Sequence, residues 1–130
     1  MRIRAYQHWV EKWDRKRGWH RTSPSHTLIH ALEEMGEVAR LVLNLEGYKG
    51  AESPEAVREE LATELSDLFV FLFKLAYQCG IDVEEALKAG QAKADERYGD
   101  LAAASAELER YLAQQAENLA QMQGQEDGGT

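Results

Sequence analysis

Residues 63–73 read TELSDLFVFLF, and this stretch decides the fold. From Leu68 to Phe73 every position is apolar, which is the composition of a helix that is buried on most of its surface. No segment of the chain alternates polar and apolar residues with the period of two that is typical of a strand. We therefore predict an all-α protein with a central helix over residues 54–79.

The boundaries of the other helices follow from local signals. Ser23 and Ser53 each precede a proline, a pairing typical of an N-cap followed by the first helical residue. Asp82 and Glu85 form a capping box, and Gly80 is typical of a helix end. The predicted helices cover residues 2–17, 24–45, 54–79, 83–98 and 100–122. They form a four-helix-type bundle with an additional C-terminal helix, followed by a flexible, Gly-rich tail over 124–130.

Length and charge limit the class of protein. A chain of 130 residues suits one domain, here residues 1–123. The net charge is −8, and residues 1–21 carry +5, so the rest carries −13. Such an acidic body disfavours nucleic acid, and the apolar run at 68–73 is too short to cross a membrane. We expect a cytoplasmic protein whose basic first segment either steers an anionic ligand or offsets the acidic body.

Acidic residues recur at helical spacing on two of the predicted helices. Glu33, Glu34 and Glu37 lie on the first, and Glu64 and Asp67 lie on the second. Spacings of three or four residues place each group on one helical face, where like charges cost about 0.2–0.5 kcal/mol per exposed pair. The sequence therefore carries an unfavourable arrangement twice, and each instance needs an explanation.

The first acidic group has an ordinary explanation, whereas the second does not. The helix over 24–45 has an apolar stripe, and its acids lie opposite on what is typical of a solvated face; the stripe consists of Leu28, Leu32, Met35, Ala39 and Leu43. Glu64 and Asp67 instead enter the apolar stretch, where unpaired carboxylates are costly to bury. Lys74 is placed to neutralise one of them, and a divalent cation neutralises the group.

The chemistry of the candidate ligands selects the metal. All of them are carboxylates, and the chain contains no Glu-x-x-His. Oxygen ligands suit Mg²⁺ or Mn²⁺ and argue against zinc or a di-iron centre. Because carboxylate-bound Mg²⁺ usually keeps positions for water and substrate phosphates, the pattern points to phosphate chemistry.

The order of these motifs resembles the MazG-like, all-α nucleoside triphosphate pyrophosphohydrolases, over residues 25–98. The motifs are Glu33-Glu34-x-x-Glu37, Glu64-x-x-Asp67, the run GIDVEEAL at 80–87, and Lys93-x-x-x-Arg97-Tyr98. The resemblance implies helices intertwined in a homodimer or homotetramer. It also implies Mg²⁺-dependent hydrolysis of a (d)NTP between the α- and β-phosphates, which yields a (d)NMP and pyrophosphate and cleans the nucleotide pool.

The resemblance also implies roles for single residues. The implied metal ligands are Glu34, Glu37, Glu64 and Asp67. Glu33 acts beside them or as a base, and completes the expected catalytic set. Lys93 and Arg97 contact phosphate with Tyr98 beside them, although a solvated basic pair has the same spacing.

Recognition of the base and sugar stays open, because Gln91 and Ala94 stand where many relatives carry an asparagine. Trp19 is the best candidate for stacking on a base, and His26 and Asn44 are further candidate contacts. Two other functions also stay open: a phosphoribosyl-ATP pyrophosphohydrolase-like enzyme, and a non-catalytic helical protein that binds nucleotide or oligomerises. The helix over 100–122 carries a heptad seam, which packs against the bundle or a second subunit.

Overall fold

The computed structural model describes residues 1–48, 50 and 52–128. Within these ranges all regular structure is helical, so the predicted all-α class is confirmed. The elements are α1 (Ile3–Arg17), the short 3₁₀ helix η1 (Trp19–Arg21), α2 (Pro24–Leu45), α3 (Pro54–Gln78), α4 (Val83–Tyr98) and α5 (Leu101–Asp127). No helix in the described part of the chain has the length and apolar character needed to span a membrane.

The predicted caps are present at the helix starts. Ser23, Ser53 and Asp82 each accept a hydrogen bond from the backbone N–H three residues later, at 3.3, 3.2 and 3.0 Å. Two boundaries differ from the prediction. Gly18 ends α1 at φ 73°, a conformation that favours glycine, and this turn starts η1, which the sequence did not predict. Helix α5 continues to Asp127, beyond its predicted end near residue 122.

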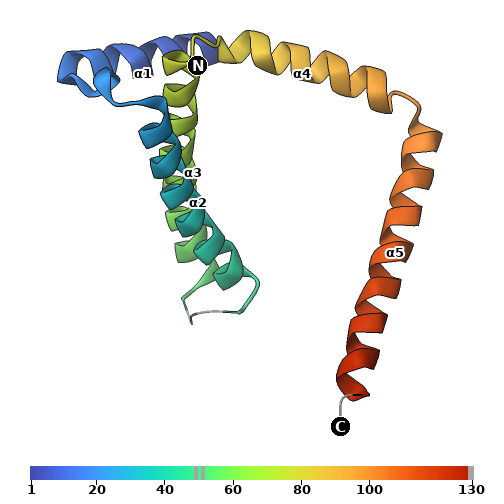
Figure 1. The fold of residues 1–130 in the computed structure, drawn as a ribbon. Helices are drawn as coiled ribbons and strands as arrows, with labels where there is room; N and C mark the ends of the chain where they lie inside the picture. The colour runs from blue at the N-terminus through green and yellow to red at the C-terminus, as the bar shows by residue number, and fades with distance from the viewer. Residues whose placement is uncertain (49, 51, 129–130) are drawn as a thin grey trace. The chain divides into compact units, whose positions relative to one another are not determined.

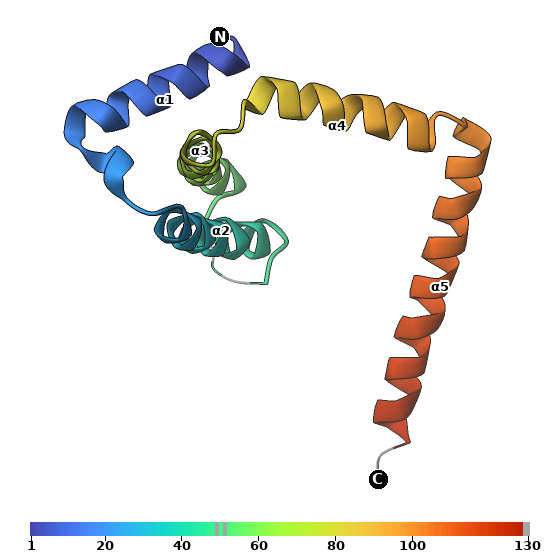
Figure 2. The same ribbon diagram turned by 45° about the horizontal axis from the view of Figure 1, so that its top comes forward.

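The chain divides into two compact units, Met1–Leu87 and Lys88–Thr130. The expectation of one domain over 1–123 stays a prediction. In the first unit α2 and α3 run antiparallel and side by side (Figure 1), and α1 crosses the C-terminal part of α3 (Figure 2). The buried apolar side chains are Val10 on α1, Ala31 and Leu41 on α2, and Val57 and Leu68 on α3.

The predicted apolar stripe of α2 is wrong as a description of the core. Leu28, Leu32 and Met35 are 46%, 62% and 49% exposed, because α2 turns the face of Ala31 and Leu41 toward α3. The apolar run of α3 is likewise not buried on every side. Leu41 and Leu68 are buried in this unit, while other large apolar residues such as Leu32 and Phe69 remain on the outer surface of the pair.

Helix α1 is fixed to the far end of α3 by aromatic and polar contacts. The rings of Tyr6 and Phe73 meet edge to face at 4.9 Å. Gln7 is buried, and its Nε2 donates to the carbonyl oxygen of Ile81 at 2.6 Å while its Oε1 accepts from the N–H of Val83 at 2.9 Å. This side chain therefore joins α1 to the start of α4.

A second link between α1 and the start of α4 is ionic. Arg4 lies 2.8 Å from Asp82 and 2.7 Å from Glu85. The pKa of Asp82 is lowered by the backbone N–H of Glu85 and then by the Arg4 guanidinium. Because these side chains are largely exposed, the pairs add little stability beside the buried Gln7 contacts.

The second unit contains most of α4 and all of α5. Asp100 caps α5 by accepting a hydrogen bond from the N–H of Ala103 at 3.1 Å. The heptad-seam residues Leu108, Leu112 and Leu119 are 53%, 47% and 53% exposed. What the seam packs against stays a prediction.

We predict that Gln7→Leu destabilises the protein by about 1–2 kcal/mol, because it removes two hydrogen bonds from a buried side chain to part-buried backbone groups. Urea unfolding followed by circular dichroism measures this loss. Lys12→Leu on the exposed side of α1 is the matched control and changes stability by less than about 0.5 kcal/mol. Equal stability of the Gln7 variant and wild type would show that the link does not hold α1.

Candidate metal centre and adjoining cavity

The packing of α2 on α3 brings three carboxylates together. Glu34 on α2, and Glu64 and Asp67 on α3, each offer one oxygen, and these oxygens lie within 4.8 Å of one another. Glu34 and Glu64 are half-buried, and Asp67 is exposed. Three of the four predicted metal ligands thus form one acidic cluster, contributed by two helices that are distant in sequence.

The electrostatics of the acidic cluster suit a cation. The pKa of Glu34 is raised, first by burial, then by its hydrogen bond to Glu64 and the charges of Glu64, Asp67 and Glu37. The pKa of Tyr6 is also raised, first by burial and then by the charge of Asp67. Carboxylates that disfavour one another's ionised form are stabilised by a bound cation, and an oxygen-only donor set fits Mg²⁺ or Mn²⁺.

The other two predicted acids point away from this group. Glu37 pairs with Arg40 at 3.2 Å, and Arg40 also binds Glu60 at 2.8 Å. Glu33 is exposed and lies 3.6 Å from Nδ1 of His30. Glu37 is three residues after Glu34 and shares its helical face, so a change of side-chain rotamer can redirect it toward the acidic cluster, whereas Glu33 directly precedes Glu34 and lies on a different side of α2.

The predicted role of Lys74 as a counter-ion for Glu64 or Asp67 is wrong. Lys74 is buried, and its Nζ donates to the carbonyl oxygen of Trp19 at 3.0 Å and lies 3.4 Å from Asp14 Oδ2. Its ammonium group extends toward the connection between α1 and α2. Within the described residues no Lys or Arg forms an ion pair with a member of the acidic cluster.

A cavity of about 430 Å³ lies among α1, η1, α2 and α3. The rings of His30 and Phe71 stack at 5.5 Å, and His26 meets His30 edge to face at 4.8 Å. The aromatic and imidazole side chains that line the cavity are Trp9, Trp13, Trp19, His26, His30 and Phe71. We call this space the aromatic cavity.

The aromatic cavity lies next to the acidic cluster. His30 is four residues before Glu34 on α2, and Phe71 is four residues after Asp67 on α3. Four residues of helix advance by roughly 6 Å and return to the same face. One ligand of moderate length can therefore reach both sites.

The α1 side of the cavity is a row of aromatic rings. The ring centroids of Tyr6 and Trp9 are 5.7 Å apart, and those of Trp9 and Trp13 are 5.3 Å apart. The guanidinium of Arg17 lies 3.4 Å from the Trp13 ring and 5.9 Å from the Trp19 ring. Planar groups stack favourably on such a surface.

The structure brings together some of the predicted substrate contacts and separates others. Trp19 and His26 line the aromatic cavity. Asn44 is near the opposite end of α2, where a Cβ added at Gly50 would meet its side chain at 3.0 Å. Asn44 thus packs against the loop that follows α2 and takes no part in the cavity of this chain.

The predicted phosphate contacts lie on α4 in the second unit. Lys93 and Arg97 are exposed, and the Arg97 guanidinium is 5.2 Å from the ring of Tyr98. Their approach to the acidic cluster stays a prediction.

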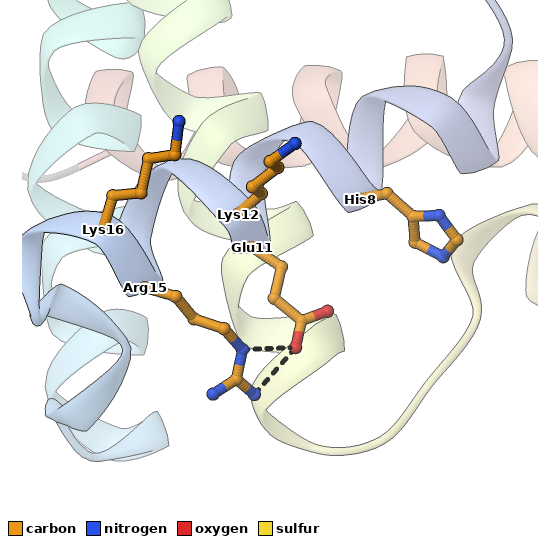
Figure 3. A pocket seen from close by; sticks show the side chains of 5 residues that line it. All are labelled: His8, Glu11, Lys12, Arg15 and Lys16. Atoms are coloured by element: carbon orange, nitrogen blue, oxygen red, sulfur yellow. Dashed lines mark hydrogen bonds and ion pairs between the residues drawn. The ribbon is translucent and has the colours of Figure 1, made fainter.

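The outer face of α1 carries the basic segment (Figure 3). A shallow hollow of about 440 Å³ is lined there by His8, Glu11, Lys12, Arg15 and Lys16. Arg15 donates a hydrogen bond to the Glu11 carboxylate at 2.8 Å and forms an ion pair with it. Lys12 and Lys16 extend on the other side of the helix. Part of the basic charge is therefore neutralised within α1 itself.

Sequence reasoning missed several residues of the cavity wall, among them Phe71, Asp14 and Lys74. Phe71 is one apolar residue within an apolar run, so nothing marked it. Asp14 lies in a charged helix, and its partner Lys74 is distant in sequence. Only the fold shows that this acid and this base share a wall of the cavity.

Comparison with known proteins agrees with the geometry. The family model described as the MazG nucleotide pyrophosphohydrolase domain matches residues 22–101, and the chain belongs to this family. A relative, the uncharacterized protein YvdC of Bacillus subtilis (strain 168), is 30% identical over 103 residues, which are 75% of this chain and 97% of YvdC. No solved structure matches the chain.

We predict that Mg²⁺ or Mn²⁺ raises the melting temperature relative to protein in EDTA, because a bound cation relieves the repulsion in the acidic cluster. Glu64→Gln and Asp67→Asn abolish this rise. The control is Glu59→Gln, an exposed acid on the same helix, which keeps it. A rise of equal size in all four proteins would place the cation elsewhere.

Proposed function

We propose that this protein is a Mg²⁺-dependent nucleotide pyrophosphohydrolase that cleaves a (d)NTP between its α- and β-phosphates and removes unwanted nucleotides from the pool. The observation that carries the proposal is the acidic cluster of Glu34, Glu64 and Asp67, whose oxygens lie within 4.8 Å one turn from the aromatic cavity. Family membership supports the same reaction class. A helical scaffold without catalysis has no need of this arrangement.

The residues that would hold Mg²⁺, or Mn²⁺ in its place, are Glu34, Glu64 and Asp67, joined by Glu37 when it leaves Arg40. A cation bound there would neutralise phosphate charge and lower the pKa of water. The three carboxylates come from α2 and α3, and the packing of these helices fixes the distances between them. Their rigid spacing is the contribution of the fold, because positioning and charge account for most of phosphoryl-transfer catalysis.

The reaction consumes one water molecule. A water oxygen bonds to a phosphorus of the α–β anhydride, the P–O bond to the bridging oxygen breaks, and the products are a nucleoside monophosphate, pyrophosphate and a proton. Glu33 is the proposed acceptor of the proton from water, since it is next to Glu34 in sequence and its carboxylate remains exposed. Lys93 and Arg97 are the proposed contacts to the leaving phosphates, with Tyr98 beside them.

The base of the nucleotide is proposed to occupy the aromatic cavity. Trp19 and His26 belong to its wall, and stacking on an aromatic side chain contributes roughly 1–3 kcal/mol per base. Stacking tolerates every base because each has a π-face. The aromatic wall therefore explains affinity for a base, whereas discrimination between bases requires polar groups.

We also propose that the protein is a homodimer or homotetramer. Large apolar side chains remain on the outer faces of α2 and α3; they include Leu28, Leu32, Met35, Phe69 and Leu72, at 46%, 62%, 49%, 52% and 41% exposure. Apolar patches of this kind mark association surfaces. Asn44 remains a proposed contact to the nucleotide, in a site that a second copy would share.

The test is release of pyrophosphate from a panel of ribo- and deoxyribonucleoside triphosphates with Mg²⁺. We expect turnover of at least one of them, and a loss of at least about 100-fold in kcat/KM for Glu64→Gln and for Asp67→Asn, because both remove oxygen ligands of the metal. Glu59→Gln is the control and keeps wild-type activity. Hydrolysis that is indifferent to both ligand variants, or no hydrolysis of any nucleotide, would refute the proposal; turnover of phosphoribosyl-ATP alone would change the substrate.

A further inference from the structure

Asp14 and Lys74 form an ion pair in the wall of the aromatic cavity. Their side chains are 6% and 10% exposed, and both residues line the space between the aromatic rings. Two charged groups in so apolar a wall are expensive to desolvate, and such pairs contribute little net stability. We therefore looked to ligand binding, and not to stability, to explain why this ion pair lies in the cavity wall.

Both side chains keep hydrogen-bonding capacity that the described residues leave unused. The Tyr77 hydroxyl donates to Asp14 Oδ2 at 2.5 Å, and Lys74 Nζ lies 3.4 Å from the same oxygen. Oδ1 of Asp14 accepts no bond from the described part of the chain. Lys74 has three N–H donors, and its described acceptors are Asp14 and the carbonyl of Trp19. One acceptor and one donor thus remain beside each other.

The connection between α1 and α2 does not depend on this pair alone. Gln78 Nε2 donates to the carbonyl of Thr22 at 2.6 Å, and Gln78 Oε1 accepts from the Thr27 hydroxyl at 2.7 Å. The Thr22 hydroxyl also donates to the Trp19 carbonyl at 3.1 Å. These neutral bonds anchor Thr22, the residue that ends η1, and Thr27 on α2, in addition to the bond that Lys74 donates to Trp19.

An adjacent donor and acceptor between aromatic surfaces match the edge of a nucleobase. A carboxylate accepts from an exocyclic amine or a ring N–H, and an ammonium donates to a ring nitrogen or a carbonyl oxygen. We propose that Asp14 and Lys74 bind the hydrogen-bonding edge of the base and determine which base the enzyme accepts. The part of this inference that concerns turnover rests on the proposed function.

The fixed order of acceptor and donor makes the proposal specific. Cytosine and uracil have nearly the same shape, but their adjacent donor and acceptor positions are exchanged; adenine and hypoxanthine differ in the same way. A site with one carboxylate and one ammonium at fixed positions can hydrogen-bond both edge groups of one base in such a pair. With the other base, the same two protein groups are left without hydrogen-bond partners. Sites that hydrogen-bond a substrate reject mismatched analogues strongly.

The experiment compares kcat/KM within each pair, dCTP against dUTP and dATP against dITP. We expect wild type to prefer one member of at least one pair by about tenfold or more. Asp14→Asn turns the free acceptor into a donor, and Lys74→Met removes the donor while it keeps the length of the side chain. Either variant is expected to reduce the ratio to within about twofold of unity.

Matched variants separate recognition from structure. Glu11→Gln and Lys12→Met carry the same changes on the outer face of α1 and keep the wild-type ratio. If Asp14→Asn does not fold, Lys74→Met carries the test.

Binding of dCMP, dUMP, dAMP and dIMP, measured by calorimetry without metal, tests the same inference without turnover. A preference within one pair that disappears in Lys74→Met supports it even if no triphosphate is hydrolysed. Turnover with a base ratio that neither variant changes would overturn the inference and leave the proposed function intact. Equal wild-type affinities within both pairs would also overturn it.

Discussion

The contact between α2 and α3 is the constraint on which the rest of the structure depends. It holds Glu34 against Glu64 and Asp67, and it does so at a half-buried position where like charges repel. The face of α2 that makes this contact includes the buried side chains of Ala31 and Leu41. The stability of the helix pair thereby sustains an arrangement of carboxylates that is unfavourable without a cation.

The aromatic cavity is a second consequence of the same helix pair. Because α1 crosses the end of α3 (Figure 2), the aromatic rings of Trp9 and Trp13 line the same cavity as His30 and Phe71, one turn beyond the acidic cluster. A polar network from the last turns of α3 fixes the connection that carries Trp19. The helix pair thus places the acidic cluster at one turn and the aromatic surface at the next, which is the arrangement that the proposed function uses.

The sequence predicted the features that depend on local chemistry. Caps such as Ser23 and Ser53 fix helix starts through contacts three residues away, and the acids stand out by their spacing. It failed where the outcome depends on a distant element. The apolar stripe with Leu32 reads as core, yet α3 packs on a different face of α2, and Lys74 reaches Asp14 across the fold instead of the nearby acids. Periodicity identifies an apolar face but does not say what covers it.

The central claim is that the carboxylates of α2 and α3 and the phosphates of a nucleotide share one metal ion. Electron–nuclear double resonance of Mn²⁺ added to the protein with a non-hydrolysable α,β-imido deoxynucleoside triphosphate tests it most directly. The account predicts phosphorus couplings on protein-bound Mn²⁺ in wild type and in Glu59→Gln, and loss of that bound species in Asp67→Asn. Protein-bound Mn²⁺ without phosphorus coupling, or coupling that persists unchanged in Asp67→Asn, would contradict the account.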